Sequence, residues 1–533
     1  MAARRASQPV RIAVRAAGTT KATITAAAAA AAAAAVAEQG RIEVRRLDPR
    51  KAGEWIVTLR VPDAIGSPGY ASTAWEIAHR LRDADGVTLA EADIPVGAFD
   101  PRTDAAGALV TTDCSSDASS ADRKWALDTI GWQAALTSMD PAVRGGVGIR
   151  VGHPDSGFTD HFALGATAVD QTTDWDVIDN DDDATDPLRP PRPTLANPLP
   201  NPGHGTSTAS VILGRGDGNG FSGVAPAATL VSFRATESVV QVFDSDVADA
   251  VRRARLAGCQ VVSMSLGGTG FFGLREAIQM AVDSGMIVMA AAGNQVGVVT
   301  APASYDNCIA VAATGPGDVP WAGSSRGAAV DVAAPGRCVW AALFDWARSP
   351  PGRIVARTNG TSYAVAHLAG AAALWLAHHG HAALVTRYGA PRVQAAFLHQ
   401  LRLPGVCARP PGWDDDWGVG RVDAEALLAA PLPDPAALDG VGAFGTPPDA
   451  DAVERLAALT DVPPARVQEW LTETLGPTDV AKQADRFAGE LAYLLLEDQS
   501  FRAGLVQPGL RAFSTDTPPA AASPRLRAAL EAR

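Results

Sequence analysis

Short apolar segments alternate with helix-length segments after Lys124, and this alternation limits the fold more than any other feature of the chain. The segments predicted as strands are Val147–Val151, Thr229–Phe233, Val261–Leu266 and Met286–Ala291. The segments predicted as helices between them are Ser207–Leu213, Ser245–Ala257 and Gly273–Ser284. Parallel neighbouring strands need crossover connections of this length. The pattern therefore predicts an α/β domain with a mostly parallel sheet, with functional side chains on the loops after the strands' carboxyl ends.

Length and charge exclude several classes of protein. A chain of 533 residues is too long for one ordinary domain, so two or three are expected. Its 47% hydrophobic content supports a large core and excludes a wholly disordered chain. The net charge of −13 argues against nucleic-acid binding. No segment approaches 18 consecutive strongly apolar residues, so no membrane span is predicted.

Composition divides the chain into further parts. Residues 1–40 contain an alanine run and are predicted as a low-complexity extension rather than an export signal, which favours a cytoplasmic protein slightly over a secreted one. Residues 41–105 read as a small α+β unit, with strands at Glu54–Val61 and Val87–Val96 around a helix at Ser72–Arg82.

The remaining boundaries follow changes in composition. A polar linker is expected over residues 106–123, followed by the α/β domain over 124–430. Residues 431–513 are predicted to form an accessory helical region, with helices at Ala450–Leu459, Pro464–Leu475 and Val480–Leu496, and 514–533 a mobile tail. The five cysteines form no CxxC pair and are expected as buried free thiols, with a disulfide left open.

Four short segments could carry chemistry. Asp155 follows a strand in a Ser-Gly turn, and His204 stands between glycines before a helix. Asn294 ends an apolar strand, and Ser362 begins an alanine-rich helix. Each has an ordinary structural explanation: a turn-capping Asp, a core His, a turn Asn and an N-cap Ser. Each also fits nucleophilic catalysis, with Asn294 as a donor toward developing negative charge.

Together these segments identify a family. The sequences DSG, GHGT, SLGG, AAGN and NGTS, in that order, resemble subtilisin-like serine proteases, the subtilases (peptidase family S8). The segments GVAP, PASYDNCIAVAA, APG and GVGRVD extend the resemblance over about residues 124–430. It implies a three-layer subtilisin-like fold and a serine endopeptidase that acts through an acyl-enzyme intermediate.

The resemblance also implies roles for individual residues. Ser362 would be the nucleophile, His204 the general base and acid, and Asp155 the residue that orients the imidazole. Asn294 would complete an oxyanion hole with the Ser362 N–H. Extended substrate would bind along a strand edge and pocket formed by Ser265, Leu266, Gly267, Gly268, Ala291 and Gly293.

The sequence departs from the family pattern near the nucleophile and the base. Tyr363 stands where the family usually has Met, Ala366 where it has Pro, and Ser207 where it often has a second His. The α+β unit over 41–105 occupies the place of a subtilase propeptide, so a cut between about residues 97 and 124 is expected. A permanent accessory domain is the alternative.

The remaining polar residues suggest other cofactors and functions. The acidic stretch Asp174–Asp186 suits calcium, with Asp179, Asp181 and Asp183 as weak candidates, and no cofactor is required. A metal-dependent hydrolase is an alternative, in which His153, Asp155, His161 and His204 would ligate zinc. A catalytically inactive scaffold is the other. The expected partners are protein or peptide substrates, the chain's own propeptide-like unit, and a protein bound by the C-terminal helices.

Overall fold

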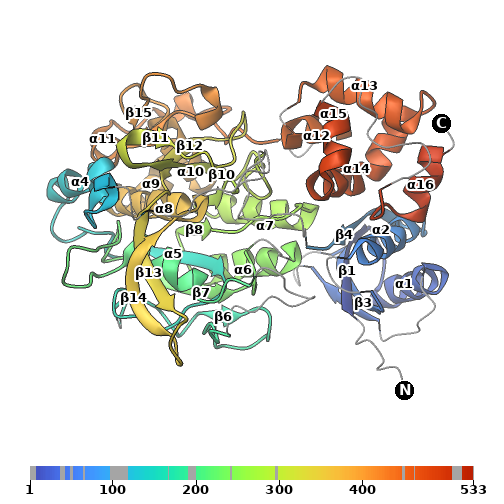
Figure 1. The fold of residues 1–533 in the computed structure, drawn as a ribbon, viewed down its shortest axis with the longest axis horizontal. Coiled ribbons are helices and arrows are strands. Elements are labelled where there is room, and N and C mark those ends of the chain that lie inside the picture. Colours follow the sequence, from blue (N-terminus) through green and yellow to red (C-terminus); the bar gives the residue numbers. More distant parts are fainter. Residues whose placement is uncertain are drawn as a thin grey trace.

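The computed structural model describes residues 8–35, 42–47, 52–63, 67–95, 114, 118–165, 167–189, 200–239, 243–294, 298–446, 450–460, 462–506 and 519–531. These residues form a central α/β domain (118–446), an N-terminal unit (8–95) and a C-terminal helical unit (450–531). The two terminal units lie side by side at one end of the central domain (Figure 1).

The central domain is built on a ten-stranded sheet in the order β15-β16-β12-β10-β9-β8-β5-β7-β6, with β11 paired to β10. From β16 to β6 the neighbours are parallel, as the strand–helix alternation predicted. The strands are β5 (Arg150–Asp155), β6 (Trp175–Asp176), β7 (Thr229–Arg234), β8 (Val261–Met264), β9 (Ile287–Ala291), β10 (Ile309–Gly315), β11 (Val319–Pro320), β12 (Val332–Pro335), β15 (Cys407–Ala408) and β16 (Arg421–Val422). A separate hairpin pairs β13 (Val339–Asp345) with β14 (Gly352–Thr358).

Helices cover both faces of this sheet and make three layers. Alternate residues of β10 enter different cores: Ile309 and Val311 pack with α5 and α8, whereas Ala310 and Ala312 pack with α6 and α7. The helices are α3 (Trp125–Thr129), α4 (Trp132–Ser138), α5 (His204–Leu213), α6 (Asp244–Leu256), α7 (Phe272–Asp283), α8 (Thr361–His379), α9 (His381–Tyr388), α10 (Val393–Leu401) and α11 (Ala424–Ala429).

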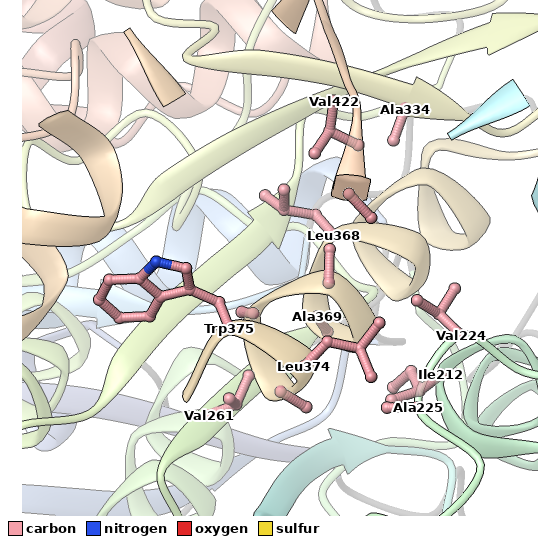
Figure 2. Packing of buried hydrophobic residues seen from close by; sticks show 14 of the residues in the cluster. Ile212, Val224, Ala225, Val261, Ala334, Leu368, Ala369, Leu374, Trp375 and Val422 are labelled. Carbon is pink, nitrogen blue, oxygen red and sulfur yellow. The ribbon is translucent and has the colours of Figure 1, made fainter. Parts of the chain in front are cut away.

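Helix α8 runs through the middle of the larger core. Every residue from Thr361 to Ala377 is buried, so this helix is apolar on all sides rather than amphipathic. Figure 2 shows Leu368, Leu374 and Trp375 of α8 among side chains from the sheet and from α5, where the small Ala369 allows close packing. A helix held from all sides gives its first residues, including Ser362, a fixed position.

The N-terminal unit is a four-stranded antiparallel sheet in the order β2-β3-β1-β4, with two helices. Its elements are β1 (Gln8–Ala16), α1 (Lys21–Ala35), β2 (Glu43–Arg46), β3 (Glu54–Val61), α2 (Pro68–Arg82) and β4 (Val87–Asp93). The prediction of an extension over residues 1–40 is wrong for its described part. Strand β1 lies between β3 and β4, and the alanine run forms α1, which buries Ile24, Ala28 and Ala31.

The C-terminal unit is helical, as predicted. Its helices are α12 (Ala452–Thr460), α13 (Pro464–Leu475), α14 (Val480–Glu497), α15 (Gln499–Val506) and α16 (Pro524–Glu531). The prediction of a mobile tail over 514–533 is wrong for its described part, because α16 buries Leu526 and Leu530 in the core that α14 shares with α2.

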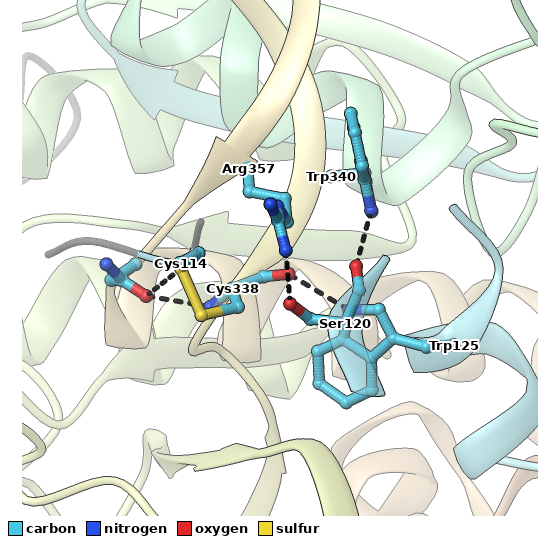
Figure 3. Close-up of a disulfide and its surroundings, with 7 residues drawn as sticks. Cys114, Ser120, Trp125, Cys338, Trp340 and Arg357 are labelled. Carbon is cyan, nitrogen blue, oxygen red and sulfur yellow. Dashed lines mark hydrogen bonds between the residues drawn. A yellow bond between two sulfur atoms is a disulfide. The ribbon is translucent and has the colours of Figure 1, made fainter. Parts of the chain in front are cut away.

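A disulfide joins the predicted linker to the residue just before β13. Cys114 is bonded to Cys338, and the Cys338 carbonyl accepts a hydrogen bond of 2.9 Å from the Trp125 indole (Figure 3). Cys259 and Cys308 are buried free thiols, as expected, whereas Cys407 is only half-buried. Most of the remaining linker, 106–113 and 115–117, lies outside the described residues. Within the described chain, no helix has the length and apolar character needed to span a membrane.

Candidate active site

Asp155 is the last residue of β5, at the carboxyl edge of the sheet. Its side chain is fully buried, and Oδ1 accepts hydrogen bonds from the Ser156 N–H (2.7 Å) and from His204 Nδ1 (2.8 Å). Burial alone would raise the pKa of Asp155, but His204, with further help from His153 and the Ser156 N–H, lowers it below its ordinary value. Asp155 is therefore an ionised acceptor that holds the Nδ1–H tautomer of His204.

His204 is the first residue of α5, and glycine allows this placement. Gly203 has a φ of 81°, which a side-chain-bearing residue rarely adopts, and it turns the chain directly into the helix. A Cβ on Gly205 would lie 2.1 Å from the Gly157 carbonyl oxygen, so only glycine lets α5 approach the loop after β5. The two glycines of the GHG motif thus bring His204 against Asp155.

Asp186, at the end of the acidic stretch, connects the two segments that carry Asp155 and His204. Its Oδ2 accepts hydrogen bonds from the Gly203 N–H (2.7 Å) and the Ser156 hydroxyl (2.8 Å). Ser156 Oγ in turn accepts the Gly205 N–H at 3.0 Å. One carboxylate therefore joins the loop carrying Asp155 to the turn carrying His204.

Ser362 lies in the first turn of α8 and is 5% exposed. Its Oγ donates to the Ser265 carbonyl oxygen at 3.4 Å. No hydrogen bond joins Ser362 and His204, both of which the structure describes. The aspartate–histidine half of the predicted triad is thus assembled, while the serine hydroxyl is turned toward the strand edge.

Asn294 is oriented by the residue before Ser362. Its Oδ1 accepts hydrogen bonds from the Thr361 N–H (2.8 Å) and the Thr361 hydroxyl (2.9 Å). Both bonds use the amide oxygen, so the Nδ2 hydrogens remain for another acceptor. This is the orientation that an oxyanion donor requires.

The predicted substrate edge is bonded to the protein's own chain. Besides receiving the Ser362 hydroxyl, this edge donates its Gly267 N–H to the Val239 carbonyl at 3.2 Å and its Gly268 N–H to the Ala301 carbonyl at 2.9 Å. Of the other residues predicted for the pocket, Leu266 is 3% and Ala291 5% exposed, and Gly293 donates its N–H to Thr361 Oγ1 at 3.3 Å. A substrate strand that pairs with this edge would have to replace the hydrogen bond from the Gly267 N–H to the Val239 carbonyl.

Two of the departures from the family pattern contact each other. The Tyr363 hydroxyl hydrogen-bonds with Ser207 Oγ at 3.1 Å and accepts from Thr358 Oγ1 at 3.3 Å. Ser207 lies on α5 one turn after His204, so the pair links the helix that begins with His204 to the helix that carries Ser362. The sequence contained both substitutions, but only the structure reveals that they meet.

His153, which the sequence suggested only as a zinc ligand, is a further neighbour of Asp155. Its Nε2 lies 3.1 Å from Thr208 Oγ1 and 3.8 Å from Asp155 Oδ2. Thr208 Oγ1 also lies within hydrogen-bond distance of the His204 and Gly205 carbonyl oxygens, so it connects His153 to the first turn of α5. Burial lowers the pKa of His153 and keeps it neutral. Its position two residues before Asp155 on the strand was the available signal.

The residues proposed for metal binding do not all come together: His153, Asp155 and His204 are neighbours, but His161 and the calcium candidates lie apart from them. His161 directs Nε2 at the carbonyls of Leu343 and Ile354, away from Asp155. Among the calcium candidates, Asp179 pairs with Arg234, while Asp181 and Asp183 accept backbone N–H groups of their own turns. Over the described ranges, no group of three or more His, Cys, Asp or Glu side chains has a geometry that could hold a metal ion.

Comparison with known proteins places this geometry in a family. The model of the subtilase family matches residues 146–420. Thermitase from Thermoactinomyces vulgaris is 32% identical over 253 residues, which is 47% of this chain and 78% of thermitase. Subtilisin E from Bacillus subtilis is 36% identical over 194 residues, 35% of this chain and 49% of subtilisin E, so the match spans about half of that relative.

A solved structure agrees on the fold. Fervidolysin from Fervidobacterium pennivorans, described as a keratinolytic enzyme related to subtilisin, matches 81% of this chain and 62% of its own with a TM-score of 0.53. At 20% identity this similarity supports the fold alone. The family match and the relationship to thermitase show that the chain belongs to the subtilase (S8) family of serine proteases.

Proposed function

We propose that the protein is a serine endopeptidase that hydrolyses peptide bonds of protein substrates through Asp155, His204 and Ser362. The observation that carries the proposal is the 2.8 Å hydrogen bond between His204 Nδ1 and the buried Asp155, whose partner in the proposal, Ser362, lies in the first turn of α8. Asp155 fixes the tautomer that leaves His204 Nε2 free to accept a proton.

Catalysis would begin with a rotation of the Ser362 side chain. The hydroxyl would leave the Ser265 carbonyl and donate to His204 Nε2, while the substrate backbone takes its place along Ser265–Gly268. Ser362 Oγ would attack the scissile carbonyl as His204 takes its proton, and Asn294 Nδ2 with the Ser362 N–H would stabilise the oxyanion. His204 would then protonate the leaving amine, and water would hydrolyse the acyl-enzyme.

Hydrolysis of casein tests the proposal. We expect activity in the wild-type chain and none above background in Ser362→Ala or His204→Ala, with folding of the variants checked by circular dichroism. A chelator should leave activity unchanged if no metal is required, and a loss that added calcium restores would assign a role to the acidic stretch. Equal hydrolysis by wild type and both variants would refute the site assignment.

We also propose that the N-terminal unit is propeptide-like and that the chain is cut between residues 97 and 113. Cys114 is held to Cys338, so a cut before it leaves the new end attached to the central domain. Mass spectrometry of wild type and Ser362→Ala would detect the cut as a fragment present only in the wild type. The disulfide further supports a compartment where disulfides persist, rather than the cytoplasm that the sequence favoured.

A further inference from the structure

Helix α2 of the N-terminal unit is buried on more than one side. Its buried residues include the apolar Tyr70 and Ile77 and the polar Glu76 and His79. The Tyr70 hydroxyl donates to the Pro9 carbonyl of β1, which identifies the side facing the sheet. A helix buried almost all round needs a second covering layer, and α14 and α16 supply it (Figure 1).

The apolar part of this contact is formed with α14. The rings of Trp75 and Tyr493 lie 6.4 Å apart, and those of His79 and Phe487 meet edge to face at 4.9 Å. Gly489 of α14 faces Trp75 so closely that a Cβ there would lie 2.9 Å from the indole ring. The side chains of α2, α14 and α16 belong to a single core rather than to two cores in contact.

A buried polar network lies inside the same contact. Glu490 of α14 is fully buried, and its Oε2 lies 2.6 Å from His79 Nε2 of α2. The N–H and the hydroxyl of Ser523, directly before α16, also donate to Glu490. Because Ser523 belongs to the C-terminal unit, separating the units would break the His79–Glu490 contact and leave the two Ser523 bonds in place.

Ion pairs close the rim of the contact. Arg525 of α16 pairs with Glu76 and with Asp83 at the end of α2, and Arg486 of α14 donates to Asp83 at 2.8 Å. The Ser72 hydroxyl donates to the Ala522 carbonyl at 2.8 Å. Every one of these bonds joins residues 403 to 450 positions apart in the chain.

The opposite side of the N-terminal unit contacts the central domain. Arg11 of β1 pairs with Asp246 of α6 at 2.6 Å, and Glu91 of β4 accepts the Phe272 N–H of α7 at 3.2 Å. The N-terminal unit therefore lies between α6 and α7 on one side and the C-terminal unit on the other.

We infer that the C-terminal helical unit is a retention clamp for the N-terminal unit: α14 and α16 keep that unit bound after the chain is cut between residues 97 and 113. The partner of the C-terminal helices is then a segment of the same chain. The clamp rests on the proposed cut, but the binding itself can be measured without the peptidase activity.

The test uses the full chain with Ser362→Ala, so that self-cleavage plays no part. A recognition sequence for a specific protease is inserted between residues 97 and 113, and the chain is cut by adding that protease. Gel filtration then measures how fast the N-terminal fragment leaves. We expect co-elution of the two fragments in the parent protein.

Two variants with matched controls assign the retention to the C-terminal unit. Gly489→Leu should speed fragment release at least tenfold, because its side chain clashes with Trp75 while replacement of a helical glycine favours α14 itself. Ala481→Leu on the exposed side of α14 is the control. Arg525→Met should also speed release, whereas Arg527→Met should not, since Arg527 bonds only to carbonyls of residues 520 and 522.

The outcomes separate this inference from the proposed function. A fragment that leaves the parent protein at once, or release rates equal in Gly489→Leu, Arg525→Met and their controls, would overturn the clamp. Either result would leave the casein and mass-spectrometry experiments unaffected. Loss of casein hydrolysis would not change the release rates, because they are measured in the inactive chain.

Discussion

Individual residues of the candidate site are held by neighbours as well as by one another. Asn294 is held by its amide oxygen, which leaves its N–H donors free, and Asp155 Oδ1 accepts the Ser156 N–H as well as His204 Nδ1. Tyr363 is held by its hydroxyl, one residue after Ser362. The positions of the candidate catalytic groups therefore depend also on residues that have no proposed part in the reaction.

Asp155→Asn should lower kcat by about 10⁴-fold, because a neutral amide neither holds the Nδ1–H tautomer of His204 nor stabilises the imidazolium. Peptide hydrolysis under saturating substrate measures it. Asp160→Asn, an exposed carboxylate a few residues further along the chain, is the control and should retain full activity. A fall of less than tenfold in Asp155→Asn would contradict the role given to the carboxylate.

Tyr363→Phe and Ser207→Ala should each destabilise the protein, and their effects should not add. Each variant leaves the other hydroxyl short of a partner, so we expect a coupling of about 1 kcal/mol in the free energy of unfolding. Urea denaturation of the two single variants and the double variant measures it. Effects that simply add would show that the hydroxyls do not interact.

Site residues that stand in the family's short motifs were predictable from the sequence, whereas contacts between separate elements were not. Asp155, His204, Asn294 and Ser362 stand in short segments whose glycines and order are distinctive. His153 and Ser207 lie in two of the same segments, but their contacts with Thr208 and Tyr363 join separate elements and could not be predicted from the sequence.

At the scale of helices and strands, the local hydrophobic pattern predicted some elements with their observed bounds. The predicted bounds of β3 (Glu54–Val61) and α13 (Pro464–Leu475) coincide with the observed ones. Strand β1 was missed because its stabilisation comes from pairing with β3 and β4, some 40 to 80 residues away. Its position beside an alanine-rich stretch concealed the pattern.

Replacing the disulfide with Cys114→Ser and Cys338→Ser should lower the stability of the central domain. The bond closes a loop of 224 residues, and losing such a constraint costs about 2–5 kcal/mol. Thermal unfolding of the double variant should match that of reduced wild type. An unchanged Tm in both would show that the bond does not stabilise the fold.

At the scale of the whole molecule, the three parts form a stack rather than a chain of separate domains. The C-terminal unit covers α2, and the N-terminal sheet covers α6 and α7. The first of these contacts includes hydrogen bonds between residues 403 to 450 positions apart and the second includes hydrogen bonds between residues 181 and 234 positions apart, which no periodicity within either segment encodes. The sequence therefore predicted the parts and not their assembly.

The contact between the N-terminal unit and α6 should depend on pH. Burial raises the pKa of Asp93 to about 6, despite the nearby Arg11 and the Ser245 N–H. The folded state therefore binds the Asp93 proton more tightly than the unfolded state does. The resulting stabilisation of the fold is complete below about pH 4 and is lost as the pH rises through 6. The free energy of unfolding of Asp93→Asn, relative to that of wild type, should therefore increase by up to about 3 kcal/mol from pH 4 to pH 7.5.

Urea denaturation of wild type and Asp93→Asn at both pH values measures this difference, and the comparison cancels the other titrating groups. An identical difference in unfolding free energy at pH 4 and 7.5 would contradict a raised pKa for Asp93.

Covalent labelling with a fluorophosphonate tests the central claim most directly, because only a serine activated by its histidine reacts readily. We predict that peptide mapping of the labelled wild-type chain finds the phosphonate on Ser362, and that Ser362→Ala and His204→Ala remain unlabelled. Labelling of Ser362→Ala to the wild-type extent, or label on another residue of the wild type, would contradict the account.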